Sequence, residues 1–168
     1  MASLHNSESI VTSSSSPFVS IVLPVRNEER YIVRCLDSII NQEYPSNRRE
    51  VIIVDGMSTD TTRALIAQKA AGAAITVLDN PARVVTTALN IGFLAAHGEF
   101  IVRMDAHARY APDYVSSCIA VAQETAAANV GGHMRALPGS TSLVAHAIML
   151  AHVNPFGLGG GRFHDPDQ

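Results

Sequence analysis

Short runs of apolar residues alternate along the chain with longer segments in which apolar residues recur at every third or fourth position. The short runs predict buried strands, because they are four to six residues long and rich in Val and Ile. The longer segments predict helices, because side chains three and four apart share one helix face. Strands are expected at 18–23, 51–54, 75–78 and 100–104, with a short one near Val130. Helices are expected at 28–41, from 58 or 59 to about 71, at 84–96, from 112 to about 128, and from about 142 to 152.

This alternation predicts an α/β fold with a mostly parallel central sheet and helices on both of its faces. Residues 18–168 are expected to form one domain. Residues 1–17, with four consecutive serines at 13–16, are expected to be a disordered lead-in. Pro24 follows the first apolar run and is expected to end that strand.

Polar residues come directly after each of the four main expected strands. In parallel α/β sheets, ligands bind outside the carboxyl ends of the strands, so these residues are expected to share one rim. They are Arg26, Asn27 and Glu28 after the first strand, Asp55 after the second, Asp79 and Asn80 after the third, and Asp105 and His107 after the fourth. The rim is therefore the predicted site.

Composition narrows the class of protein. The net charge of −3 gives no support for a nucleic-acid-binding protein, which normally carries a basic surplus. The two cysteines, Cys35 and Cys118, lack metal-ligand spacing and are expected to be free thiols in a reducing cytoplasm. The amino terminus lacks the pattern of a signal peptide, and no apolar stretch is long enough to cross a bilayer. Membrane attachment is therefore expected only through a part outside this chain.

The triplet Asp105-Ala106-His107 is the strongest candidate for a metal site. Its carboxylate and imidazole are two residues apart at the end of an expected strand, where they can bind a cation that neutralises phosphate. An Asp-x-His turn alone is weak evidence, because Asp is also common in ordinary turns. The position of the triplet on the rim favours the functional interpretation.

Several stretches together resemble one family. Residues 19–29, Val-Ser-Ile-Val-Leu-Pro-Val-Arg-Asn-Glu-Glu, resemble the opening of the inverting glycosyltransferases of family 2, which have the GT-A nucleotide-sugar-binding fold. Residues 35–42 are similar to the first helix of that family, 54–62 to its second-strand motif, and 88–100 to the approach to its metal motif. The resemblance covers roughly 18–115 and is specific through order and spacing combined. Residues 103–110 and the glycines at 131–132 and 157–161 look most similar to membrane-bound exopolysaccharide enzymes of succinoglycan type.

The resemblance implies a truncated, Rossmann-like GT-A fold and a site for a UDP-sugar, with UDP-glucose as the first choice. The acceptor would be a saccharide or a lipid-linked saccharide, and the cofactor a divalent cation, Mn²⁺ or Mg²⁺. The implied donor-binding residues are Pro24, Val25, Arg26 and Glu28 around the base, Asp55 as acceptor of a hydrogen bond from uracil, Arg83 at the base or phosphate, and Asp105 with Ala106 at the ribose. Asp105 is the implied catalytic residue, and Asp105 and His107 are the implied metal ligands.

Two positions depart from the family pattern. Many members carry a third carboxylate where His107 stands and an acidic residue where Gly56 stands. An imidazole is a softer ligand than a carboxylate, so His107 favours Mn²⁺ over Mg²⁺.

The residues after His107 contain no motif of the kind that supplies the catalytic base in the resembled family. The carboxylates there are Asp113, Glu124, Asp165 and Asp167, of which the first two fit a helix surface and the last two a chain end. The chain is therefore expected to be the donor-binding part of an incomplete enzyme. The alternatives are a nucleotide-sugar-binding fragment without turnover, and a Rossmann-like dehydrogenase or receiver domain. The absence of G-x-G-x-x-G after the first strand counts against the dehydrogenase.

Overall fold

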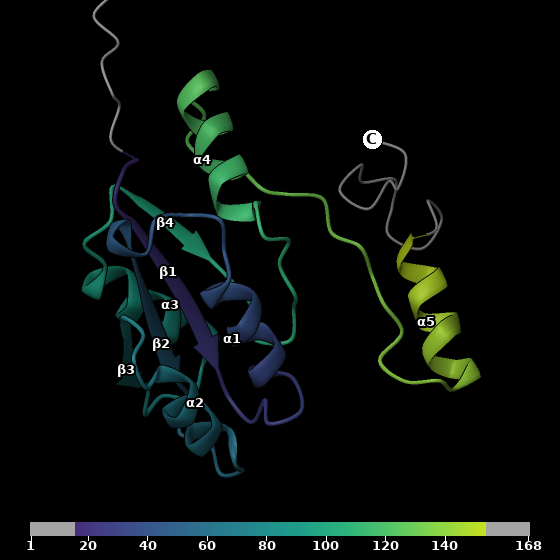
Figure 1. The fold of residues 1–168 in the computed structure, drawn as a ribbon. Coiled ribbons are helices and arrows are strands. Elements are labelled where there is room, and N and C mark those ends of the chain that lie inside the picture. Colours follow the sequence, from purple (N-terminus) through teal and green to yellow (C-terminus); the bar gives the residue numbers. More distant parts are fainter. Residues whose placement is uncertain (1–15, 154–168) are drawn as a thin grey trace, which may run out of the picture. The chain divides into compact units, whose positions relative to one another are not determined.

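The computed structural model describes residues 16–153. By its internal contacts the chain divides into two compact units, Met1–Ser117 and Cys118–Gln168. The strands of the first unit are β1 (Val19–Val25), β2 (Arg49–Asp55), β3 (Ile75–Asp79) and β4 (Phe100–Arg103) (Figure 1). Its helices are α1 (Ile32–Ile40), α2 (Thr62–Ala70) and α3 (Val85–Ala95), with a 3-10 helix at Ser46–Arg48. Helix α4 (Tyr114–Thr125) begins in the first unit, and α5 (Leu143–Val153) belongs to the second.

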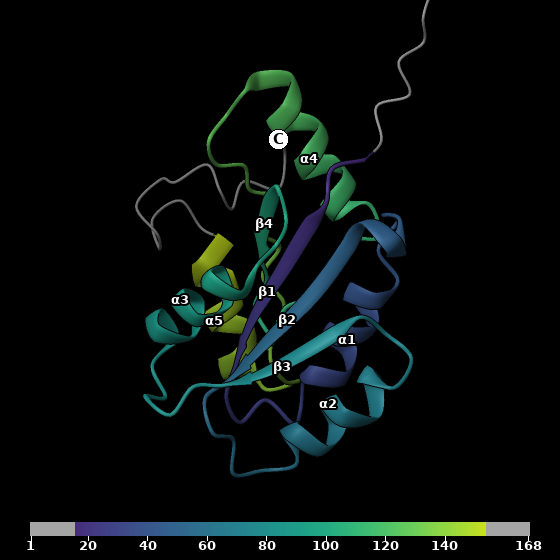
Figure 2. The same ribbon diagram turned by 90° about the vertical axis from the view of Figure 1, so that its left-hand side faces the viewer.

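The four strands form one parallel sheet in the order β3-β2-β1-β4. Helices α1 and α2 cover one face of this sheet and α3 covers the other (Figure 2). A helix follows each of β1, β2 and β3 and carries the chain back to the start of the next strand, which is the usual connection between parallel strands. The predicted α/β class and the two-sided covering are confirmed.

Strand β1 is the centre of the core. It pairs with β2 on one side and with β4 on the other, and Val19, Ile21, Val22 and Leu23 have no exposed surface. Because both faces of the strand are covered, its sequence is apolar except for Ser20, whose buried hydroxyl donates to Glu50 Oε1 at 2.6 Å. Because β1 is buried and paired on both edges, its position in the sheet is fixed. The residues that follow its carboxyl end therefore lie at the rim.

Helix α3 approaches the sheet closely at Gly92. A Cβ at this position would lie 2.4 Å from Val22 Cγ1 and 3.3 Å from Val54 Cγ2. Both valines are fully buried, and their branched side chains have few rotamers with which to move away. Glycine is therefore required here for packing.

The loops after β1 and β2 are joined by reciprocal hydrogen bonds. Backbone N–H groups of the first loop donate to side chains of the second: Asn27 to Ser58 Oγ at 2.9 Å, Glu28 to Thr62 Oγ1 at 2.8 Å, and Glu29 to Asp60 Oδ2 at 3.3 Å. In return, Thr59 N donates to Asn27 Oδ1 at 2.8 Å. The structure places the start of α1 at Ile32, after this loop, so the expected start at residue 28 is wrong.

Two further expectations about strands are wrong. Pro24 lies inside β1, opposite Val54, and the strand continues to Val25. Residues 126–142 contain neither strand nor helix, so the short strand expected near Val130 is absent. Among residues 16–153, no helix is both long and apolar enough to cross a membrane.

We expect Gly92→Ala to lower the free energy of unfolding by about 1–2 kcal/mol. The overpacking against Val22, typically about 1–3 kcal/mol, should outweigh the better helix propensity of alanine, which is worth up to about 1 kcal/mol. Urea denaturation measures the change. Gly139→Ala is the matched control, because a Cβ there meets nothing within 4 Å. Adding Val22→Ala to Gly92→Ala should cost less than the sum of the two single changes, and strict additivity would contradict the close contact.

Candidate functional site

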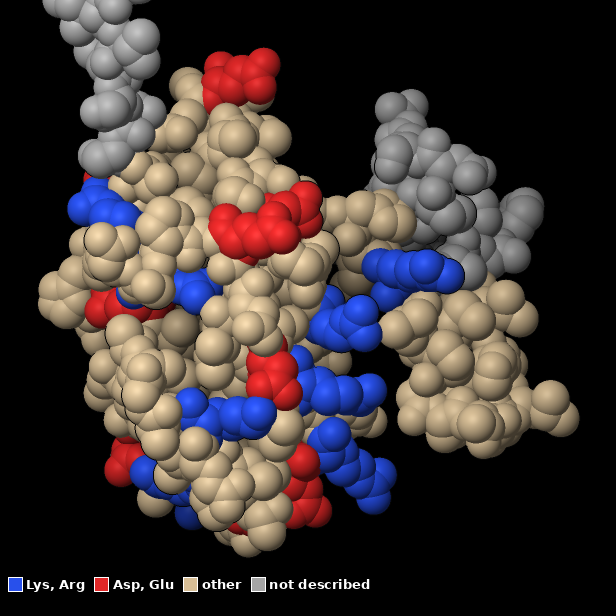
Figure 3. All heavy atoms as spheres, in the orientation of Figure 1, with Lys and Arg blue, Asp and Glu red and all other residues tan. Residues whose placement is uncertain are grey.

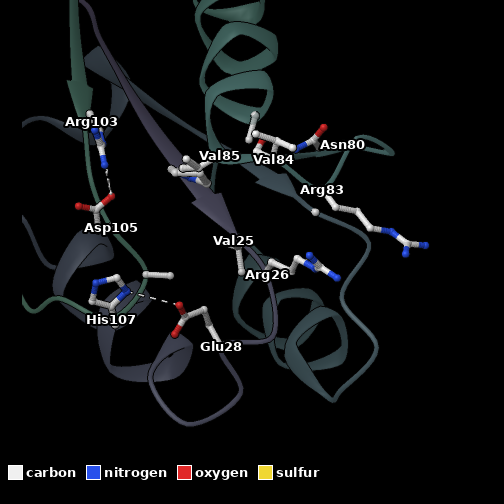
Figure 4. Close-up of a pocket in the computed structure, with 14 residues that line it drawn as sticks. Val25, Arg26, Glu28, Asn80, Arg83, Val84, Val85, Arg103, Asp105 and His107 are labelled. Carbon is white, nitrogen blue, oxygen red and sulfur yellow. Dashed lines mark hydrogen bonds and ion pairs between the residues drawn. The ribbon is translucent and has the colours of Figure 1, made fainter. Parts of the chain in front are cut away.

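A pocket of about 380 Å³ lies at the carboxyl ends of β1 and β4 and beside the loops that follow β2 and β3 (Figure 4). Its walls come from segments far apart in sequence, which the parallel sheet brings to one rim. The lining residues are Pro24, Val25, Arg26, Glu28, Gly56, Asn80, Arg83, Val84, Val85, Ala88, Arg103, Asp105, Ala106 and His107.

Arg26 lies against the backbone of Gly56 at one wall of the pocket. A Cβ on Gly56 would be 3.2 Å from both Cβ and Cδ of Arg26. Gly56 N also donates to the carbonyl oxygen of Val25 at 2.7 Å, which joins the ends of β1 and β2. The absence of a side chain at residue 56 thus leaves room for the aliphatic part of Arg26, and its guanidinium extends along the pocket wall (Figure 4).

Asp55 is placed behind this wall and does not line the pocket. Its carboxylate is completely buried and accepts hydrogen bonds from Ser58 Oγ at 2.5 Å and from Ser58 N at 3.1 Å. Arg63 Nη1 lies 3.2 Å from Asp55 Oδ2, and its Nη2 lies 2.8 Å from Asp79 Oδ1. These contacts compensate the buried charge and connect the ends of β2 and β3. Base recognition by Asp55 stays a prediction, and its observed contacts are all within the protein.

Asn80 supplies a buried acceptor without a donor. Its side-chain N–H₂ donates to the carbonyl oxygen of Val84 at 2.9 Å, and this bond fixes which end of the amide is oxygen. Oδ1 is buried and has no hydrogen-bond partner within residues 16–153. A buried carbonyl oxygen without a protein partner is costly, and a water, an ion or a ligand group in the pocket can satisfy it. Asn80 is on the predicted rim but was not predicted as a binding residue.

Arg83 enters the pocket from a strained turn. Its φ of 58° lies in the left-handed region, and its N–H donates to the carbonyl oxygen of Asn80 at 3.0 Å. Asn27 and Met57 have similar φ values of 54° and 58° in the loops after β1 and β2. Residues other than glycine rarely adopt this conformation, and such residues concentrate at functional sites.

The opposite wall carries the Asp-x-His turn (residues 105–107). Arg103 Nη2 lies 3.1 Å from Asp105 Oδ1, and His107 Nδ1 lies 3.4 Å from Glu28 Oε1. Figure 4 shows both pairs at the pocket, the first from the end of β4 and the second across from the loop after β1. Both side chains of the turn are well exposed, with 42 % of Asp105 and 67 % of His107 accessible.

The donor atoms of this turn fit a divalent cation. A carboxylate oxygen and an imidazole nitrogen are ligands that Mn²⁺ accepts, and both side chains are accessible from the pocket. No group of three His, Cys, Asp or Glu side chains that could hold a metal occurs within residues 16–153. The turn thus offers two ligands, and a cation there needs the remaining ones from a ligand such as a diphosphate or from water.

The pocket is more basic than the chain as a whole. Arg26, Arg83 and Arg103 line it together with the two carboxylates of Glu28 and Asp105, although the chain has a net charge of −3. Over the lower half of the face that Figure 3 draws, where Figure 1 places α1, α2 and the loops at the carboxyl ends of the strands, basic and acidic side chains are interspersed, so the surplus of arginine is a property of the pocket lining itself. Arginine is suited to bind phosphate through paired hydrogen bonds.

A family model for glycosyl transferase family 2 matches residues 20–163. The chain belongs to glycosyltransferase family 2. The succinoglycan biosynthesis protein ExoA of Rhizobium meliloti is 34% identical to it over 155 residues, which cover 90% of this chain and 45% of that protein. The chain spans about half the length of such curated relatives. Both the family and the similarity to a succinoglycan protein were predicted from the sequence motifs and are confirmed.

Two solved structures of glycosyltransferases share the fold. The mannosyltransferase PcManGT of Pyrobaculum calidifontis, solved with GDP-Man and Mn²⁺, is 32% identical with a TM-score of 0.60, over 63% of this chain and 32% of that one. Glucosyl-3-phosphoglycerate synthase of Mycobacterium tuberculosis, solved with Mn²⁺, UDP and its glucosylated product, is 25% identical with a TM-score of 0.50, over 62% and 39%. The predicted GT-A fold is therefore confirmed.

For this family 2 chain, the structure brings together nearly all of the predicted site residues. Pro24, Val25, Arg26, Glu28, Arg83, Asp105, Ala106 and His107 line one pocket, and Asp55 alone stands behind it. Sequence reasoning missed Arg103, Asn80 and the apolar wall of Val84, Val85 and Ala88. The basic residue two before Asp105 was a usable signal for Arg103, because alternate residues of a strand point to the same side.

We expect Arg83→Gly to be more stable than Arg83→Ala by about 1 kcal/mol, because glycine adopts a φ of 58° without the clash of a Cβ. Both changes remove the guanidinium from the pocket, so they should weaken binding of a pocket ligand equally. Urea denaturation measures the stability difference. The control pair is Arg109→Gly and Arg109→Ala, at an exposed position without positive φ, where glycine should bring no gain. Equal stability of the two Arg83 variants would contradict the left-handed turn.

Proposed function

We propose that this pocket binds the nucleoside diphosphate of a sugar donor, UDP-sugar first, and that the enzyme transfers the sugar to a saccharide acceptor in polysaccharide synthesis. The observation that carries the proposal is the partnerless Oδ1 of Asn80, in a pocket that also holds three arginines. A nucleobase offers the ring N–H that this oxygen needs, and a diphosphate offers the negative charge that the arginines need.

The two ends of the pocket fit the two ends of such a donor. Asn80, Arg83 and Gly56 lie on the side of the loops after β2 and β3, where a flat base can lie against the side chain of Arg26. Asp105 and His107 lie on the side of β4, together with Arg103. The base would therefore face the β2–β3 side, and the diphosphate would reach toward the Asp-x-His turn.

Asp105 and His107 are the residues proposed to hold a divalent cation beside the diphosphate. A cation there supplies Lewis-acid neutralisation of the leaving diphosphate. Arg103 pairs with Asp105 and Glu28 with His107, and both pairs would open to let Asp105 and His107 bind a cation. The Mn²⁺ in the two similar glycosyltransferase structures supports this assignment.

Transfer with inversion also needs a carboxylate that removes the proton of the acceptor hydroxyl, on the side opposite the leaving group. Of the carboxylates after His107, Asp113 accepts a hydrogen bond from Ser117 Oγ at the start of α4, and Asp165 and Asp167 lie outside the described residues. We propose that the base and the acceptor contacts come from outside the pocket described above. A lipid-linked acceptor would place the enzyme at the inner face of the cell membrane.

We expect the chain to bind UDP and Asn80→Ala to weaken that binding about tenfold, the scale of one or two hydrogen bonds to a buried group. Isothermal titration with UDP, GDP and NAD measures the affinities and separates a glycosyltransferase from a dehydrogenase. Asn41→Ala is the matched control, because Asn41 also donates its amide to a backbone carbonyl, that of Asp37, but lies outside the pocket. If folded Asn80→Ala binds UDP as tightly as the wild type, the nucleobase does not bind at Asn80 and this assignment is wrong.

We expect transfer of [¹⁴C]glucose from UDP-glucose to a lipid-linked saccharide to fall about a hundredfold in Asp105→Asn, because loss of a charge that holds a cation costs several kcal/mol at the transition state. The assay uses a longer reading frame that contains this chain, because the base is proposed to come from outside the pocket. Asp113→Asn is the control, since Asp113 lies outside the pocket. Equal loss in both variants, or none in Asp105→Asn, would contradict the proposed role.

A further inference from the structure

The backbone of Asp105 is held on both sides by side chains that do not line the pocket. Its N–H donates to the hydroxyl oxygen of Tyr110 at 2.6 Å, and its carbonyl oxygen accepts a hydrogen bond from Cys35 Sγ at 3.5 Å. Met104 N still donates to Val22 O as part of the sheet. Asp105 is thus the first residue after β4 whose N–H group does not bond to a backbone carbonyl of β1. That N–H group donates to the hydroxyl oxygen of Tyr110 instead.

Both side chains remain in the protonated form that these hydrogen bonds need. Burial raises the pKa of the Tyr110 phenol above its ordinary value, so the hydroxyl stays neutral and its oxygen accepts. Burial also raises the pKa of the Cys35 thiol to about 12, so the thiol keeps the proton that it donates. A buried thiol of this kind is unreactive, which favours a structural role for Cys35.

Helix α1 fixes the other end of the Tyr110 segment. Tyr110 N donates to Ser38 Oγ at 3.2 Å, and the Ser38 hydroxyl donates to the carbonyl oxygen of Cys35 at 2.8 Å. The ring of Tyr110 also packs against that of Tyr114, with 5.1 Å between their centroids. Tyr110 therefore connects a rigid helix to the backbone of the residue that faces the pocket.

We propose that Tyr110 is a positioning residue, which sets the carboxylate of Asp105 in the place where it binds the cation of a donor complex. This inference rests on the proposed function. Asp105 has little else to hold it, because its side chain is 42 % exposed and pairs only with Arg103 within the described residues. Its direction is consequently set by its backbone, whose N–H is held by Tyr110 and whose carbonyl oxygen is held by Cys35 Sγ and by Ala108 N, which donates to it at 3.1 Å. A small error in the geometry of a ligand is enough to weaken a metal site.

The test compares Tyr110→Phe with Tyr44→Phe. Each change removes one tyrosine hydroxyl and keeps the ring, but the Tyr44 hydroxyl donates to Pro17 O at 2.6 Å and lies outside the pocket. UDP affinity is measured by titration calorimetry with Mn²⁺ and with EDTA, and thermal unfolding is measured in parallel. We expect Mn²⁺ to raise the UDP affinity of the wild type and of Tyr44→Phe equally. In Tyr110→Phe that gain should shrink roughly tenfold, while the affinity in EDTA stays at the wild-type value.

The outcomes separate this inference from the proposed function. A full Mn²⁺ gain in Tyr110→Phe overturns the positioning role and leaves the donor pocket intact. An equal loss of affinity in EDTA and in Mn²⁺ also overturns it, because a general loosening of the pocket would then be the cause. A wild type that binds no UDP, or binds it without any effect of Mn²⁺, overturns the positioning role together with the proposed function.

A second pair of variants covers the case in which Tyr110→Phe does not fold. Cys35→Ser keeps the side-chain donor to the carbonyl oxygen of Asp105, whereas Cys35→Ala leaves that oxygen with the N–H of Ala108 as its one donor within the described residues. We expect Cys35→Ser to retain more of the Mn²⁺ gain than Cys35→Ala does. Equal gains in the two variants would overturn the role assigned to the backbone of Asp105.

Discussion

The burial of β1 on both faces and its pairing on both edges constrain the rest of the first unit. Because β1 has no freedom to shift, its register with β2 and β4 places three strand ends at one rim. The same burial requires glycine at residue 92, where α3 crosses the strand. The pocket is therefore a consequence of how the core packs, and its walls are held by strands that cannot move independently.

Two pairs of polar side chains lie in the pocket and a third lies behind its wall. Arg103 accompanies Asp105, Glu28 accompanies His107, and Arg63 neutralises the fully buried Asp55. The first two pairs are largely exposed and cost little to separate, whereas in the third the carboxylate of Asp55 is fully buried and would be left without compensation if its partners were lost. Ligand binding can thus rearrange the Asp105 and His107 side, while Asp55 and its loop remain fixed.

The sequence predicted the sheet, its helices and most of the pocket, because hydrophobic periodicity and the carboxyl-end rule depend only on local pattern. It failed where distant segments decide the outcome. Helix α1 begins at Ile32 and not at residue 28, and the residues before it form a loop whose N–H groups at 27–29 bind side chains at the start of the α2 segment, a contact that local pattern does not reveal. The partnerless oxygen of Asn80 depends on a contact between its amide and Val84, which no spacing rule reveals. The strand expected near Val130 rested on a short apolar stretch without a partner strand.

The parallel order of the sheet also has a consequence for synthesis on the ribosome. The chain makes β1 and β2 early, but β4, the second neighbour of β1, is completed only at residue 103. At typical rates of translation, the interval between the end of β2 and the end of β4 is roughly 2 to 10 s. During that time the most apolar strand of the protein has one unpaired edge, which is the kind of surface that chaperones bind and that aggregation begins from.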